Sequence, residues 1–131
     1  MKPVQLTIFK GDYSVWRLAA DEPLPSIESS SFLSITRTND ELSVVSPTSD
    51  VPAGARSETG WRCLKVEGPL AFEMTGVLAA LSAPLAKAEI PIFVVSTYDT
   101  DYLLVKAADL ENACATLRDE GFVVEIEHKQ I

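Results

Sequence analysis

Two short segments hold most of the side chains that could do chemistry in this 131-residue sequence. The segment Ser96-Thr97-Tyr98-Asp99-Thr100-Asp101 supplies hydroxyl groups, an aromatic ring and two carboxylates. The pair Thr75-Gly76 stands where the pattern predicts the start of a helix. Free N–H groups in the first turn of a helix lie at the positive end of its dipole and favour a carboxylate. The chemistry that suits both segments is the binding of a small molecule with a carboxylate and an ammonium group.

Each residue of this candidate site has a binding interpretation and a purely structural one. Gly76 lacks a Cβ, so a ligand can approach its backbone, but Thr75-Gly76 can equally be a cap at a close contact between helix and sheet. Asp101 suits an α-ammonium group, or it is a turn residue at the end of a strand. Tyr98 can cover a ligand's side chain, or it packs in the core or at an interface. The residues alone leave both interpretations open.

Catalytic chemistry is not indicated. Asp99 and Asp101 form a carboxylate pair of the kind used in acid–base catalysis or for a hard cation, but a charged hairpin tip explains them as well. His128 is the only histidine and stands three residues from the last residue, so it is a poor triad member or zinc ligand. The six glycines form no phosphate-binding motif. We therefore expect neither an enzyme nor a metal or cofactor.

Composition narrows the class of partner. The formal net charge is −8 and the sequence pI about 4.5, which disfavours binding to nucleic acid or to an anionic membrane surface. With 47% hydrophobic residues the chain can bury a core, yet it has no apolar run near the ~20 residues that span a bilayer. No secretory signal is visible, so a cytoplasmic location is expected. Cys63 and Cys114 are far apart and are predicted to be small buried apolar residues.

The second half of the chain has the alternation of a mixed domain. Helical spacing predicts a helix over 75–89, with Leu78, Leu81, Leu85 and Ala88 buried. Asp109 can cap a second helix that ends before Gly121, with Leu110, Ala113, Cys114 and Leu117 buried. Strands are predicted at 61–66, 90–96, 101–105 and 122–127. This order, β-α-β-β-α-β, indicates an α+β, ferredoxin-like unit: a four-stranded antiparallel sheet with both helices on one face.

The first half is predicted to consist of strands and loops. Residues 5–10 and 13–18 flank the turn dipeptide Gly11-Asp12, and residues 32–38 and 41–46 flank Asn39-Asp40, which predicts two hairpins. Residues 47–60 are rich in Pro, Gly and Ser and are expected to form a loop with at most a short helix. The expected buried members of the second hairpin are Ile35, Leu42, Val44 and Val45.

A weak internal repeat links the two halves. Aligning Thr36 with Ser96 places Asn39 on Asp99, Leu42 on Tyr102 and Val45 on Val105. The N-terminal half is accordingly interpreted as a degenerate copy of the C-terminal unit. The predicted division is residues 1–60 and residues 61–131.

Two sequence segments resemble a known family. They are Leu70-Ala71-Phe72-Glu73-Met74-Thr75-Gly76-Val77-Leu78, and the run from Ile90 to Val105 that contains Ser-Thr-Tyr-Asp-Thr-Asp-Tyr. Both look like the ACT domain, in the CASTOR-like tandem form of the cytosolic arginine sensors and of short bacterial relatives. The resemblance implies a non-catalytic module that senses a small ligand, chiefly an amino acid, between paired domains. The ligand-binding residues implied by it are Ala71, Phe72, Glu73, Met74, Thr75, Gly76, Ser96, Thr97, Tyr98 and Asp101.

One position departs from the arginine sensors. In proteins of that type an acidic side chain in the loop that enters the first helix holds the cationic end of the ligand. By the resemblance, the matching residue here is Met74, beside Glu73. Arginine specificity is therefore not expected. The alternative is an oligomerisation or protein-interaction module whose ligand site has decayed. A homodimer is expected under either interpretation, because a sheet with helices on one face leaves its other face and its edges to be covered.

Overall fold

The computed structural model describes residues 4–27, 31–68 and 76–128. The chain forms two compact units, one of residues 1–10 and 62–131 and the other of residues 11–61. We call them the βαββαβ unit and the strand unit. Residues 1–10 belong with the C-terminal unit and not with the N-terminal half.

The βαββαβ unit is built on a five-stranded sheet in the order β6-β7-β5-β1-β8. The strand β5 runs from Arg56 to Val66, and its last residues belong to this unit. β6 and β7 form an antiparallel hairpin in which Ser96 lies opposite Asp101. The bounds of the other strands are β1 Gln5–Ile8, β6 Ile92–Ser96, β7 Asp101–Lys106 and β8 Val123–Ile126.

The strand β1 corrects the prediction of a four-stranded antiparallel sheet. It lies between β5 and β8, antiparallel to β5 and parallel to β8. Its alternating pattern explains this position, because Leu6 and Ile8 point into the core and are buried. The predicted hairpin around Gly11 is also wrong: β1 pairs with the end of β5, whereas β2 pairs with its beginning.

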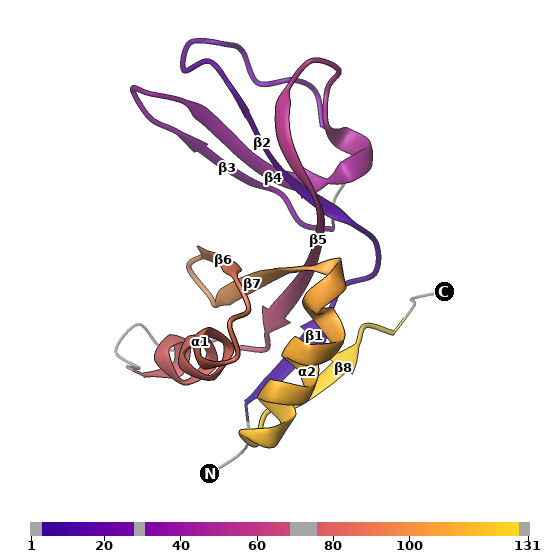
Figure 1. Ribbon diagram of the computed structural model, residues 1–131. Coiled ribbons are helices and arrows are strands. Elements are labelled where there is room, and N and C mark those ends of the chain that lie inside the picture. Colours follow the sequence, from indigo (N-terminus) through magenta and orange to yellow (C-terminus); the bar gives the residue numbers. More distant parts are fainter. Residues whose placement is uncertain (1–3, 28–30, 69–75, 129–131) are drawn as a thin grey trace. The chain divides into compact units, whose positions relative to one another are not determined.

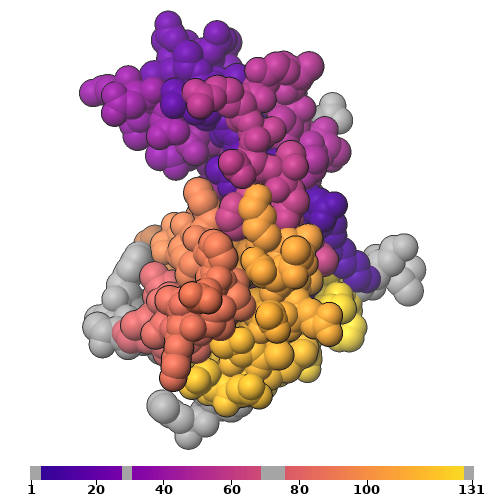
Figure 2. All heavy atoms as spheres, viewed as in Figure 1, coloured from indigo at the N-terminus to yellow at the C-terminus, as the bar shows by residue number. Residues whose placement is uncertain are grey.

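Both helices cover one face of this sheet (Figure 1), as predicted. The helix α1 (Val77–Lys87) buries Leu81 and Leu85, and α2 (Leu110–Asp119) buries Ala113, Cys114 and Leu117. In Figure 2 the atoms of the two helices, salmon and orange, lie side by side. Leu78 and Ala88 were predicted to be buried but are exposed, because the face of α1 that packs on the core holds half-buried Val77 and buried Leu81 and Leu85, four residues apart.

The strand unit is a four-stranded antiparallel arrangement in the order β3-β4-β2-β5. Its strands are β2 (Tyr13–Leu18), β3 (Ser34–Arg37), β4 (Leu42–Pro47) and the first part of β5, with a short 3₁₀ helix at Thr48–Asp50. Trp16, Leu42 and Val44 form its buried cluster. The Trp16 indole N–H donates to the Ser46 hydroxyl at 2.9 Å, which satisfies a polar group inside that core.

Two predictions for this unit need correction. Ile35 is 42% exposed because β3 is an edge strand. Residues 56–60, expected to be part of a loop, are the beginning of β5, since β2 supplies backbone partners for them. The described part of this unit holds strands and a 3₁₀ helix but no α-helix. Its origin as a degenerate copy stays a prediction.

The two cysteines are free thiols inside the fold, as predicted. Burial, with a smaller contribution from the negative charge of Glu127, raises the pKa of Cys63 from 9.0 to about 12. Burial also raises the pKa of Cys114. Both side chains therefore act as apolar packing groups. Among the described residues, no helix is both long enough and apolar enough to cross a membrane.

Replacing Leu6 tests the position of β1 in the sheet. Leu6→Ala should lower the free energy of unfolding by about 2–5 kcal/mol, because it opens a cavity in a fully buried core. The matched control, Ile35→Ala on the exposed edge strand, should change it by about 0.5 kcal/mol or less. Urea denaturation followed by circular dichroism measures both. A Leu6→Ala effect as small as the control would contradict the inserted strand.

The raised pKa of Cys63 gives stability a defined pH dependence. Unfolding exposes the thiol, which then ionises near its ordinary pKa. The contribution of the buried, neutral thiol to the free energy of unfolding is therefore fully present below pH 9 and is lost as the pH rises toward 12. Over this range the ionisation of Cys63 should lower the free energy of unfolding by up to about 1.4 kcal/mol per pH unit. Urea midpoints at pH 8, 9 and 10 should decline less steeply in Cys63→Ala than in the wild type. Parallel declines would show that Cys63 does not contribute.

Candidate ligand-binding site

The β6–β7 hairpin holds the polar segment in a fixed geometry. Ser96 and Asp101 face each other across the strands, and the Ser96 hydroxyl donates to the Asp101 carboxylate at 2.5 Å. The Thr97 N–H donates to the Thr100 carbonyl oxygen at 2.8 Å, and the Thr97 hydroxyl donates to the same oxygen at 3.1 Å. The Thr100 N–H donates in return to the Thr97 hydroxyl oxygen at 3.3 Å. Local hydrogen bonds therefore close the turn.

Thr100 fastens this turn to the end of β5. Its hydroxyl donates to the Val66 carbonyl oxygen at 2.6 Å, and its side chain is 5% exposed. Val66 is the last residue of β5, so the tip of the hairpin lies where the chain leaves the sheet toward α1. The hairpin that the sequence singled out thus adjoins the end of β5 from which the chain continues toward α1. This arrangement follows from the split βαβ order, in which β7 starts beside the end of β5.

Gly76 immediately precedes the first turn of α1. Its φ is +87° and its backbone is exposed, with no side-chain hydrogen bond at the cap. The first intrahelical bond runs from the Ala80 N–H to the Gly76 carbonyl oxygen at 2.8 Å, so the N–H groups before Ala80 have no partner within the helix. The positive φ requires glycine whether or not a ligand binds. A Cβ at this position would meet no described atom within 4 Å.

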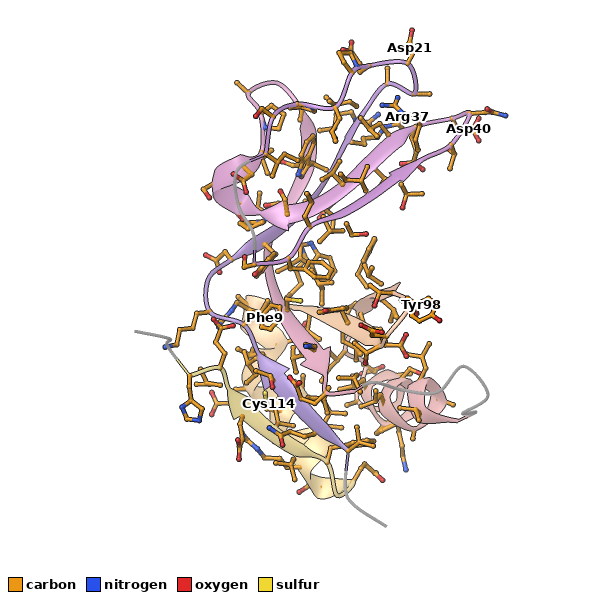
Figure 3. All side chains as sticks on the ribbon, turned by 180° about the vertical axis from the view of Figure 1, so that it is seen from behind. Phe9, Asp21, Arg37, Asp40, Tyr98 and Cys114 are labelled. Atoms are coloured by element: carbon orange, nitrogen blue, oxygen red, sulfur yellow. The ribbon has the colours of Figure 1, made fainter. Side chains whose placement is uncertain are left out.

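Tyr98 lies at the tip of the hairpin and is 80% exposed. In Figure 3 its ring extends away from the strands. It is therefore not a core residue, which removes one of its structural interpretations. Asp101 is half-buried at the first position of β7, and its carboxylate is held by Ser96. The side chains with hydrogen-bonding capacity are thus presented by a rigid turn with an aromatic ring at its edge.

Not all of the predicted site can be placed. Five of the predicted residues, Ala71 to Thr75, lie outside the described residues. Ser96, Thr97 and Asp101 are gathered on one hairpin, with Tyr98 beside them. Thr100, which sequence reasoning did not include, organises the turn. The spacing Thr97-x-x-Thr100, typical of a hydroxyl-closed turn, is the signal that would have found it.

The comparisons with known proteins agree with this geometry. A family model described as the ACT domain matches residues 56–119, which include β5, α1, the β6–β7 hairpin and α2. Residues 56–119 belong to the ACT domain family. The ACT domain is a regulatory module, and the resemblance seen in the sequence is confirmed. A second model, which describes an N-terminal domain, matches residues 11–54.

Individual relatives extend the comparison. A crystal structure of a protein from Agrobacterium tumefaciens is 40% identical, with a TM-score of 0.90, and covers 100% of this chain and 98% of its own. The human "Cytosolic arginine sensor for mTORC1 subunit 1" is 33% identical over 76 residues, 56% of this chain but 23% of the sensor. Aspartate kinase from Clostridium acetobutylicum shares the fold, with a TM-score of 0.62, 12% identity, and coverage of 85% of this chain and 33% of its own.

Thr100 offers a test of the anchored turn. Thr100→Val removes the hydroxyl that binds the Val66 carbonyl, and we expect a loss of about 1–3 kcal/mol in unfolding free energy because a buried acceptor is left unpaired. Thr100→Ser keeps the hydroxyl and should lose less. Thermal or urea unfolding compares the two. A loss in Thr100→Val no larger than the loss in Thr100→Ser, which removes only the methyl group, would contradict a dominant role for the hydrogen bond.

Proposed function

We propose that the ACT unit of this protein is a sensor that binds a small molecule, most simply an amino acid, without catalysis. The observation that carries the proposal is the hydrogen-bonded β6–β7 turn, which Thr100 fixes at the end of β5 where the chain continues to the open first turn of α1. The regulatory family and the arginine sensor among the relatives support it.

The proposed ligand makes two polar contacts and one apolar contact. Its carboxylate accepts hydrogen bonds from the N–H groups that follow Gly76, which have no partner within the helix. Its ammonium group binds the Asp101 carboxylate, which retains acceptor capacity beside the Ser96 hydroxyl. Tyr98, exposed at the edge of the turn, covers the ligand's side chain. The resemblance to the family adds Ala71, Phe72, Glu73, Met74 and Thr75 to the proposed ligand-binding residues.

The identity of residue 74 bears on specificity. The resemblance noted in the sequence implies that Met74 stands at the position of the acidic side chain that holds the cationic end of the ligand in the arginine sensors. A thioether is a weak acceptor that packs well against apolar groups. We therefore propose an amino acid with an apolar or neutral side chain rather than arginine.

Partner and location follow from the same reasoning. A homodimer would cover the strand edges that each chain leaves open, and the second copy would complete the site between paired domains. A cytoplasmic location agrees with the cytosolic relative. The second candidate function is an oligomerisation or protein-interaction module. It is favoured by Met74 and by the exposure of Leu78 and Tyr98, which present apolar surface on α1 and on the hairpin.

Asp101→Ala tests the sensor. Thermal unfolding is measured against each of the twenty amino acids at millimolar concentration. A ligand at ~100 times its dissociation constant should stabilise the wild type by about 2.7 kcal/mol, or several degrees. The shift should vanish in Asp101→Ala, because the ammonium group loses its counter-charge.

The matched control is Asp99→Ala, which removes the same charge from the same turn without touching the Ser96–Asp101 pair. It should retain the shift. A shift that persists in Asp101→Ala would reject the role of that carboxylate. A flat response of the wild type to the whole panel would favour the interaction module.

A further inference from the structure

The strand unit carries a polar groove of about 400 Å³ that is separate from the hairpin site. Its floor is the exposed side of β2, flanked by β4 and by the first residues of β5. All of its lining residues fall within residues 11–61, so the groove belongs to one compact unit. Its volume is in the range of natural small-molecule sites.

Two arginines lie on neighbouring strands of this groove. Arg17 on β2 is the direct cross-strand partner of Arg56 on β5, so both side chains lie on the same side of the sheet. The pair uses two of the five arginines in the chain. Like charges at directly opposed positions destabilise a sheet, so a negatively charged group close to both guanidinium groups would be stabilising.

Within residues 4–27, 31–68 and 76–128, the hydrogen bonds of the two arginines leave most of their donors available. Arg17 donates through Nη2 to the Asp40 carbonyl oxygen at 3.1 Å, which fixes the direction of its side chain. In the described part of the chain, the Arg56 guanidinium makes no hydrogen bond or ion pair. A guanidinium group presents five donors in a planar fork that fits a carboxylate. Ser43, which pairs with Arg17 from β4, adds a hydroxyl to the same floor.

Two acidic residues complete the charge pattern. Glu58 lies two residues after Arg56 on the same side of β5, and Glu41 lies two residues before Ser43. The groove therefore combines two positive and two negative side chains. A simple anion such as phosphate or sulfate would be attracted by the arginines and repelled by the glutamates. A ligand with a carboxylate at one end and an ammonium group at the other can pair with the arginines and with the glutamates.

We propose that this groove is a second small-molecule site that binds a zwitterion, with Arg17 and Arg56 holding its carboxylate and Glu41 and Glu58 holding its ammonium group. The site uses no residue of the β6–β7 hairpin or of the first turn of α1. It is therefore independent of the sensor site proposed above, and either can fail without the other.

The test is an NMR titration of the ¹⁵N-labelled protein with three probes: γ-aminobutyrate, butyrate and butylamine. We expect γ-aminobutyrate to shift the backbone signals of residues 15–17 and 56–58, with an affinity about tenfold or more above that of butyrate, because only the zwitterion pairs both charges. Butylamine should bind more weakly still. Equal affinities for γ-aminobutyrate and butyrate, or no shift in these signals up to 50 mM of any probe (roughly the weakest affinity of interest), would overturn the proposal.

Variants separate this site from the hairpin site. Arg56→Gln should weaken γ-aminobutyrate binding about tenfold or more, because it removes a charge-assisted contact from an exposed position that the fold does not need. Arg56→Lys keeps the positive charge but loses the planar fork of donors, so its affinity for γ-aminobutyrate should lie between those of the wild type and Arg56→Gln. Asp101→Ala should leave the titration unchanged. Binding that is indifferent to Arg56→Gln, or lost in Asp101→Ala, would overturn the assignment.

Discussion

The central constraint on the βαββαβ unit is that β5 must find strand partners on both of its edges. Its last residues lie between β1 on one side and β7 on the other, and their apolar side chains Leu64 and Val66 are fully buried beneath the helices. A central strand with an unpaired edge would leave buried N–H and C=O groups without partners, at a cost of roughly 1–3 kcal/mol each. The hairpin that carries Asp101 is thus placed by backbone pairing, and the Thr100 hydroxyl fixes its tip. The proposed sensor site depends on this pairing more than on any of its own side chains.

Much of this architecture could be predicted from the sequence because it is governed by local patterns. The helical spacing of Leu81 and Leu85, the spacing of Ala113, Cys114 and Leu117, and the apolar runs at 92–96 and 101–106 indicate the elements directly. The order of those elements then limits the fold to a few arrangements. What failed were choices between partners far apart in the chain. A turn dipeptide at Gly11 is equally compatible with a hairpin and with two strands that pair with successive parts of β5.

The residues of the candidate sites also fall into those that the local sequence could predict and those that it could not. The polar residues of the hairpin could be recognised because their types and spacing are unusual for a strand connection. The anchoring role of Thr100 could not, since it depends on a carbonyl group thirty-four positions earlier in the chain. The arginine pair of the strand unit was missed for the same reason. Arg17 and Arg56 stand far apart in the sequence, and only the register of β2 against β5 opposes them. The local sequence pattern is thus enough to identify the residues of a turn. A site on the face of a sheet can be predicted only when the register between its strands is known.

The inserted strand β1 has a consequence for biosynthesis. Gln5 pairs with Val123 and Leu6 with Val124, so β1 can find this neighbour only after the residues between the two strands have been made. Residues 11–61, by contrast, contain all the strands of their own unit and can pair early. Contacts between distant parts of a chain form slowly because a long loop must close before they contribute. During synthesis β1 can therefore pair with the end of β5 first, and its other edge stays unpaired until β8 has been made.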